Sequence, residues 1–195
     1  MERLILASQS PRRHDILNWM GIPFETEVCT EPEIAAERLS PARTVEALAL
    51  HKARFAQRLH PSDYVLGSDT VVELDGEILG KPHTPERAKE FLSRMQGRCH
   101  TVYTGVALLH NGYEDVRSCA TKVLFCPMTE KEIDWYVATG EPLDKAGAYG
   151  LQGLGSVFVD RMEGNYFNVI GLPAPTVYDM LKKAGFLTED RKGLL

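Results

Sequence analysis

The chain reads VLGSDTVVELDGEILGKP from residue 65 to residue 82, and this stretch decides the fold. It opens with an apolar, β-branched run that is typical of a half-buried strand. Asp69 and Thr70 stand in the middle of that run, where a hydrophobic residue is ordinarily found. Two interpretations of Asp69 stay open: its carboxylate caps a neighbouring backbone group, or it binds a metal ion or takes a proton from water.

A turn follows this strand. Asp75-Gly76 is a typical tight-turn pair, so residues 77–81 are expected to return antiparallel to the strand. The return would bring Lys81 towards Asp69. The stretch therefore predicts a hairpin that carries a carboxylate and an ammonium group at one end.

Composition bounds the class of protein. The 195 residues are 44% hydrophobic, enough to bury a core in one domain or one compact two-lobed unit. The net charge of −5 argues against a nucleic-acid-binding surface, which requires a basic face, but leaves room for a small anionic ligand. The 4 cysteines contain no CxxC pair and the 6 histidines no HxxxH pair, so no structural zinc site is expected. No signal peptide or membrane span is recognisable, which predicts a cytoplasmic protein without a membrane partner.

The first strand and helix predict an anion site. Residues 3–7 read as a strand, and a polar turn leads from Ser8 to a helix capped by Ser10. Arg12 and Arg13 occupy the first helical turn, where the helix dipole disfavours cations unless an anion binds there. Two serine hydroxyls, backbone N–H groups and two guanidinium groups would clamp a phosphate. The alternative is two exposed surface arginines.

The rest of the chain alternates helices and strands at first, and antiparallel hairpins dominate later. Helices are expected over 11–21, 44–59, 84–97, 129–140 and 172–184, and further strands over 24–29, 101–109, 116–125, 157–161 and 166–170. This order predicts an α/β protein with a mixed, partly antiparallel sheet flanked by helices. We expect a single domain over residues 1–186 and a charged tail over 187–195.

Three further positions concern the predicted anion site. Lys52 lies on the buried stripe of its helix, where its stem either snorkels to solvent or directs the ammonium group into the anion site. The glycine-rich loop 140–155 carries Lys145 and Gln152 and is typical of a loop that lets backbone approach a ligand. Glu33 lies in an acidic loop, a pattern that is usually solvated surface.

Two sets of charged residues remain after the known nucleotide and acyl-transfer motifs are excluded. The cations are Arg12, Arg13, Lys52, Lys81 and Lys145, and the carboxylates are Glu33, Asp69 and Asp144. Both sets are needed for metal-assisted phosphoryl chemistry, because cations offset phosphate charge while a carboxylate orients or deprotonates water.

Four blocks of sequence together resemble the Maf family of nucleoside triphosphate pyrophosphatases. They span 8–13, 68–72, 80–82 and 141–153. The resemblance implies hydrolysis between the α and β phosphates of a nucleoside triphosphate with a divalent cation, Mg²⁺ or Mn²⁺. It also implies a fold like that of inosine triphosphate pyrophosphatases, with the site in a cleft between two lobes.

The resemblance also assigns roles to residues. It implies that Asp69 is the catalytic acid/base, and that phosphate and metal contacts fall on Ser8, Arg13, Glu33, Lys52 and Lys81, with Glu33 and Asp69 as the metal ligands. We also expect Ser10 and Lys145 to contact the phosphates, an expectation that rests on the residue pattern and not on the resemblance. Ser68 departs from the Ala often found before the catalytic Asp, a change that we expect to be tolerated.

Three positions separate the subgroups of this family. Arg12, Thr70 and Gln152 resemble the branch that acts on dTTP and UTP rather than the branch that acts on 7-methyl-GTP. The sequence thus predicts a dTTP/UTP pyrophosphatase, and the resemblance makes a homodimer plausible. Two alternatives are a nucleotide-binding regulator of septum formation and cell division with little turnover, and a phosphatase that releases the γ-phosphate.

Overall fold

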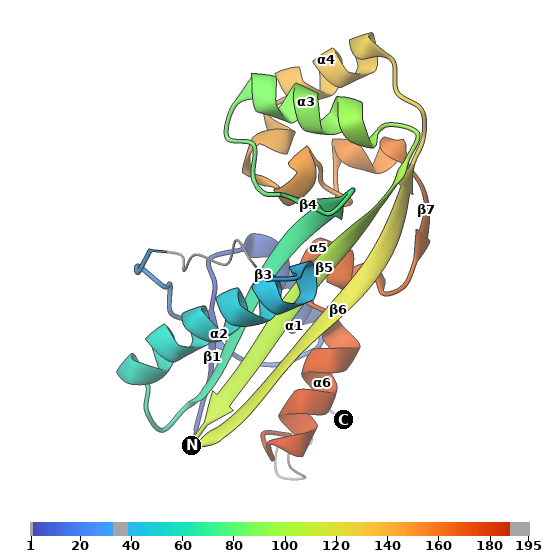
Figure 1. The fold of residues 1–195 in the computed structure, drawn as a ribbon. Helices are drawn as coiled ribbons and strands as arrows, with labels where there is room; N and C mark the ends of the chain where they lie inside the picture. The colour runs from blue at the N-terminus through green and yellow to red at the C-terminus, as the bar shows by residue number, and fades with distance from the viewer. Residues whose placement is uncertain (1, 33–38, 188–195) are drawn as a thin grey trace. The chain divides into compact units, whose positions relative to one another are not determined.

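The computed structural model describes residues 2–32 and 39–187, in which helices and strands alternate as a mixed α/β protein (Figure 1). The strands are β1 (Leu4–Ala7), β2 (Glu25–Thr26), β3 (Tyr64–Leu74), β4 (Glu77–Leu79), β5 (Cys99–His110), β6 (Tyr113–Phe125) and β7 (Val159–Glu163). The helices are α1 (Pro11–Trp19), α2 (Pro41–Leu59), α3 (Pro85–Met95), α4 (Glu130–Ala138), α5 (Tyr166–Ile170) and α6 (Ala174–Lys183), with short 3₁₀ turns η1 (Glu141–Asp144), η2 (Ala146–Ala148) and η3 (Leu154–Phe158).

The described strands form one mixed sheet in the order β2-β1-β3-β5-β6-β7, with β4 paired to β3. The pairs β1/β2 and β1/β3 are parallel, whereas β3/β4 and β6/β7 are antiparallel. The expected fold class is therefore confirmed. The chain divides into two compact units, the first of residues 1–69, 104–119 and 171–195, and the second of residues 70–103 and 120–170.

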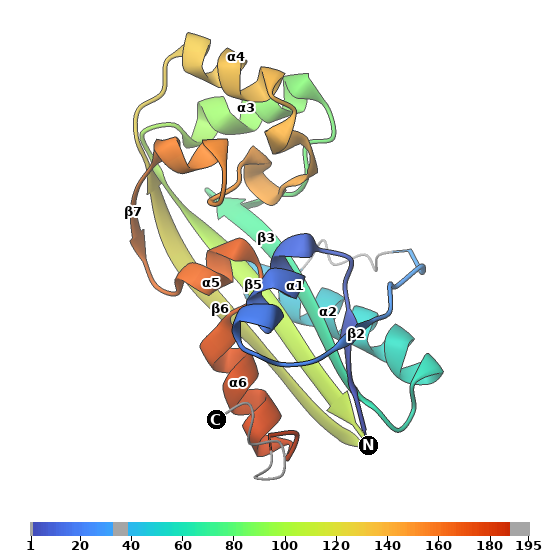
Figure 2. The same cartoon turned by 180° about the vertical axis from the view of Figure 1, so that it is seen from behind.

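In the first unit, α2 covers one face of the strands, and α1 and α6 cover the other (Figures 1 and 2). Alanines of α2 pack against β1, β3 and β5 with almost no exposed surface. A Cβ atom added to Gly67 would lie 2.2 Å from the backbone oxygen of Ala49, and one added to Gly105 would lie 2.2 Å from that of Val45. The helix therefore rests directly on the strand backbone, and this close contact depends on small residues.

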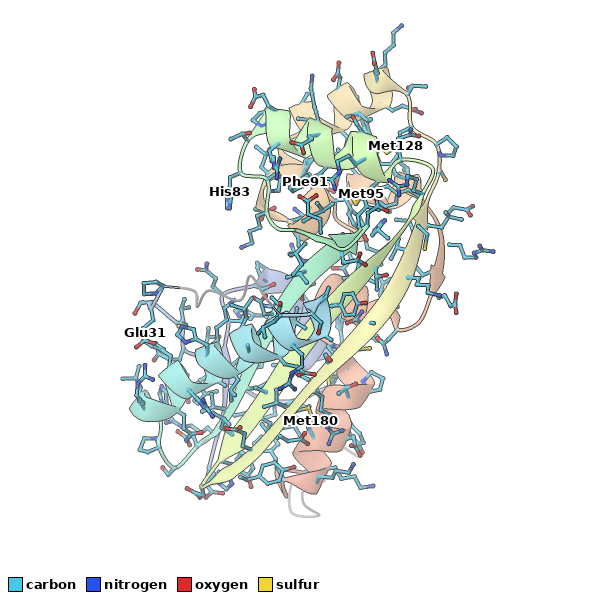
Figure 3. The ribbon with its side chains drawn as sticks, viewed as in Figure 1. Glu31, His83, Phe91, Met95, Met128 and Met180 are labelled. Atoms are coloured by element: carbon cyan, nitrogen blue, oxygen red, sulfur yellow. The ribbon has the colours of Figure 1, made fainter. Side chains whose placement is uncertain are left out.

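The second unit has its own hydrophobic core. Helices α3 and α4 pack together, and buried side chains from both join those of β3 to β6. Phe91 and Met95 of α3 and the nearby Met128 belong to this core (Figure 3). The N-terminal caps agree with the sequence: Thr84 begins α3, and Thr129 with Glu132 forms the predicted capping box of α4.

Two predictions of strands are wrong. Residues 166–170 form the helix α5 instead of a hairpin strand, because the side chain of Asn165 accepts a hydrogen bond from the backbone N–H of Asn168 (3.0 Å) and starts a helical turn. Accordingly β7 pairs with β6. The predicted strand over 24–29 is reduced to the two residues of β2.

The remaining predictions of elements are close to the structure. The tight turn at Asp75-Gly76 joins β3 to an antiparallel β4, but the ladder ends at Leu79, before Lys81. The hairpin around Asn111-Gly112 is longer than predicted on both strands. Among the described residues, every helix is too short or too polar to cross a membrane.

Candidate functional site

The turn between β1 and α1 forms around the hydroxyl of Ser8. This buried oxygen accepts a hydrogen bond from the backbone N–H of Ser10 (3.2 Å) and another from Nη1 of Arg13 (2.9 Å). Ser10 occupies the N-cap position of α1, as predicted, but its own side chain makes no capping hydrogen bond. The serines and the first helical turn are therefore brought together as the sequence predicts.

Arg13 is held on a second side as well. Its Nε donates to the backbone oxygen of Gly171 (2.8 Å), which also accepts a hydrogen bond from the hydroxyl of the buried Ser68 (3.1 Å). Burial lowers the pKa of the Arg13 guanidinium and the nearby Arg12 adds to this effect, while the Asp69 carboxylate opposes it. A cation that is partly removed from water in this way is suited to binding an anion.

Asp69 faces α2 because of strand geometry. Alternate residues of a strand share a face, so Asp69 lies on the same face of β3 as Gly67, the residue that touches the backbone of α2. On the helix, Lys52 lies next to Ala49 and Ala53, which pack at Gly67. Register alone therefore directs the carboxylate towards the ammonium group.

Lys52 and Asp69 form an ion pair through Nζ and Oδ1. The two side chains retain 18% and 13% of their exposure, so both are largely withdrawn from solvent. The ammonium group of Lys52 therefore points to Asp69, and its part in binding an anion stays a prediction. The structure gives Asp69 a side-chain partner on α2, whereas the alternative interpretation required a backbone partner.

Arg12 lies on α1 in the first unit, and the remaining described members of the predicted site belong to the second unit. Thr70 and Gln152 are half-buried, and Lys81 is exposed after the end of β4. Lys145 donates to the backbone oxygen of Glu141 (2.6 Å) and pairs with the Asp144 carboxylate (2.8 Å). Glu33 lies outside the described residues.

The glycine-rich loop is organised by a residue that the sequence did not single out. Glu141 accepts hydrogen bonds from the hydroxyl of Tyr136 (2.8 Å) and from the backbone N–H groups of Leu154 (3.0 Å) and Gly155 (3.1 Å). Burial acts to raise the pKa of this carboxyl, but the hydrogen bonds outweigh it and hold the pKa below its ordinary value.

This arrangement explains part of the glycine content. A Cβ atom on Gly153 would lie 2.8 Å from Oε2 of Glu141, and one on Gly155 would lie 2.5 Å from the hydroxyl of Tyr136. These glycines let the loop pack against its own carboxylate, an internal reason that we did not predict. In the sequence, the only sign of this arrangement is that Gly153 and Gly155 follow closely after α4 and the acidic turn η1.

The donor set near Asp69 suits a hard cation. Within the described residues Asp69 belongs to no group of three or more potential protein ligands. Mg²⁺ is commonly held by one or two carboxylates together with substrate phosphates, so the single carboxylate of Asp69 near the Ser8–Arg13 turn fits such an ion.

Curated relatives match this chain over nearly its whole length and define its class. The dTTP/UTP pyrophosphatase of Symbiobacterium thermophilum is 47% identical over 186 residues, which are 95% of this chain and 96% of the relative. Those of Moorella thermoacetica (48%, covering 93% and 94%) and Thermotoga maritima (46%, covering 98% and 96%) carry the same name.

A family model described as Maf-like protein matches residues 3–184. The chain therefore belongs to the Maf family. Among solved structures, the Ham1 protein of Staphylococcus aureus matches with a TM-score of 0.46 and 13% identity, covering 63% of this chain and 71% of that chain, a likeness too distant to support an inference.

Proposed function

We propose that this chain is a nucleoside triphosphate pyrophosphatase that hydrolyses dTTP and UTP to the monophosphate and pyrophosphate. The observation that carries the proposal is the Lys52–Asp69 pair, on the same unit as the Ser8–Arg13 turn and close enough for the Asp69 charge to act on Arg13. The names of the relatives support the choice of substrate.

Asp69 is the general base in this proposal. Its carboxylate takes a proton from water as the water oxygen bonds to the α-phosphorus. The bond from that phosphorus to the bridging oxygen breaks, and pyrophosphate leaves with the electron pair. The ion pair with Lys52 holds the carboxylate in one orientation, which reduces the reorganisation that proton transfer requires.

The phosphates bind to cations and hydroxyls of the predicted site. Ser8, Ser10 and Arg13 supply hydrogen-bond donors at the start of α1, and Lys52 supplies charge beside the base. We assign Lys81 and Lys145 to the phosphates as well. Lys145 would exchange its contact with the exposed Asp144 for a phosphate oxygen.

A divalent cation, Mg²⁺ or Mn²⁺, completes the proposed site, with Asp69 and Glu33 as its protein ligands. Bound there, the ion offsets negative charge on the phosphates. We assign the choice of a pyrimidine base to Arg12, Thr70 and Gln152. Hydrogen-bonding groups in a base pocket can reject analogues strongly, because a wrong base leaves them unpaired.

The proposed setting follows from the substrate. We infer that the chain is a single Maf-like domain over 1–186, that it acts on free nucleotides in the cytoplasm, and that neither nucleic acid nor a membrane is its partner. The net charge of −5 supports the absence of a nucleic-acid partner. We also propose a homodimer, which sedimentation of the purified protein would test.

Chromatography of reaction products tests the function. The protein is incubated with dTTP, UTP, CTP, GTP or 7-methyl-GTP and Mg²⁺ or Mn²⁺, and a parallel set contains a chelator. We expect TMP or UMP together with pyrophosphate, and no product with the chelator. Release of the γ-phosphate would identify a phosphatase, and a preference for 7-methyl-GTP would overturn the roles of Arg12, Thr70 and Gln152. Tight nucleotide binding without turnover would favour a regulator of septum formation.

A further inference from the structure

Three potential metal ligands converge in the first unit. They are Cys29 and Glu31, on the segment that follows β2, and His51 on α2. The thiol sulfur, a carboxylate oxygen and a ring nitrogen all lie within 4.8 Å of one another. Figure 3 shows Glu31 beside α2.

The imidazole of His51 lacks a hydrogen bond of its own at this point. Its Nε2 is buried and has no hydrogen-bond partner, and Oε2 of Glu31 lies 3.9 Å away. A buried ring nitrogen without a partner costs free energy, and each such atom calls for an explanation. A metal ion between the three side chains would supply the missing interaction.

Glu31 is already oriented for this role. Its second oxygen, Oε1, accepts a hydrogen bond from Nη2 of Arg58 (2.5 Å), so Oε2 is the oxygen directed at His51. Contacts of this kind fix the orientation of a ligand and raise metal affinity. Cys29 is a free, partly exposed cysteine.

We propose that Cys29, Glu31 and His51 bind a zinc ion. Thiolate, imidazole and carboxylate are the ligands of Zn²⁺, which binds them at about 2.0–2.3 Å, whereas Mg²⁺ prefers oxygen alone. Three protein ligands leave a fourth, tetrahedral position for water. A thiolate and a carboxylate offset the charge of the ion.

The proposed zinc ligands do not include Asp69, the described carboxylate of the site proposed for the pyrophosphatase. The zinc proposal also does not rest on that function. A zinc ion there would fasten the segment that carries Cys29 and Glu31 to α2. No structural zinc site was expected from the sequence, because 21 residues separate Cys29 from His51 and only the folded chain brings them together.

Cobalt replaces zinc as the spectroscopic probe. Metal-free protein is titrated with Co²⁺, and we expect a thiolate-to-cobalt charge-transfer band that saturates at one equivalent and disappears when Zn²⁺ is added. A cation bound at Asp69 gives no such band, because its ligands are oxygens. Failure of the pyrophosphatase proposal would therefore leave this result unchanged.

Matched variants identify the ligands. Cys29→Ser and His51→Ala should each remove the band, and Glu31→Gln should weaken binding by about tenfold or more. Cys99→Ser, at an exposed free cysteine, should leave the titration unaltered. Circular dichroism checks the fold of each variant, and His51→Gln replaces any His51→Ala protein that unfolds. A band that is absent from the wild-type protein, survives in Cys29→Ser or either His51 variant, or resists Zn²⁺ would overturn the proposal.

Discussion

At the scale of single residues, Asp69 is the position whose change tells most about the chemistry. Asp69→Asn preserves the size of the side chain and an oxygen that can accept a hydrogen bond from Lys52, but it removes the base. We expect kcat to fall by about 10²–10⁴-fold, the range that a general base supplies, with little change in the thermal midpoint. Steady-state kinetics with dTTP and a thermal denaturation curve measure the two effects.

The control for this substitution is Asp160→Asn, which removes an exposed carboxylate on β7. It should leave kcat unaltered. Substantial turnover by Asp69→Asn would contradict the assignment of the base, and a large loss of stability would show that the carboxylate mainly holds α2 to β3.

The candidate functional residues that could be recognised in the sequence are those that do not fit the hydrophobic pattern around them. Asp69 interrupts an apolar strand and Lys52 lies on the apolar stripe of a helix, so the sequence marked both as candidates for a functional role. Glu141 contradicts nothing locally. It joins Tyr136 to the backbone of Leu154 and Gly155, and these contacts exist only after the loop has closed. Such a residue cannot be found from periodicity.

At the scale of elements, the contact between α2 and β3 sets the position of Lys52 against Asp69. Gly67→Ala would place a methyl group 2.2 Å from the backbone oxygen of Ala49, so the helix or the strand must move. We expect a loss of about 1–3 kcal/mol in the free energy of unfolding, typical of overpacking. Because Lys52 moves with the helix, kcat should fall as well. Urea denaturation and kinetics measure both.

A glycine without neighbours provides the control. Gly80→Ala introduces the same methyl group where no atom lies within 4 Å, and its stability should remain within about 0.5 kcal/mol of the wild-type protein. Equal stability of the Gly67 and Gly80 variants would show that α2 adjusts freely. The contact at Gly67 would then not set the position of Lys52 against Asp69.

Elements were predictable where their caps and turns are local. The capping box of Thr129 and Glu132 predicts the start of α4, and the Asp75-Gly76 turn predicts the hairpin of β3 and β4. Residues 166–170 were assigned wrongly because an apolar run of five residues fits a strand or a helix equally well. The side chain of Asn165 begins the helix. The buried side chain of Asn168 holds it by donating to the backbone oxygen of Val102 (2.9 Å) and to the hydroxyl of Thr121 (3.0 Å), contacts that join distant parts of the chain.

At the scale of the whole molecule, the sequence predicted the fold class, whereas the division of the candidate site residues between the two units could not be read from it. Ser8, Arg13, Lys52 and Asp69 belong to one compact unit, and the other described members of the predicted site lie on both units. Sequence blocks give the order of residues along the chain. Their division between units depends on which strands share a core, and this follows from long-range packing that no local pattern encodes.

The dependence of folding stability on pH is also a property of the whole molecule. His100 lies in the core of the second unit, where Nδ1 has no hydrogen-bond partner and Nε2 meets the hydroxyl of Tyr149 (2.9 Å). Burial lowers the pKa of His100 from 6.5 to about 4. Between these values the unfolded chain binds more protons than the folded one, so stability falls as the pH decreases from 6.5 to 4. The loss from this residue should reach about 3 kcal/mol at pH 4.

Urea denaturation at several pH values between 7 and 4 measures this loss. His100→Gln keeps a side chain that can bind the Tyr149 hydroxyl but cannot titrate, so its stability should be lower at pH 7 and should change less with pH. His83→Asn, which removes an exposed histidine, should retain the wild-type slope. Parallel slopes for the wild-type and His100→Gln proteins would mean that the carboxylates and the other histidines set the acid sensitivity, because they also take up protons in this range.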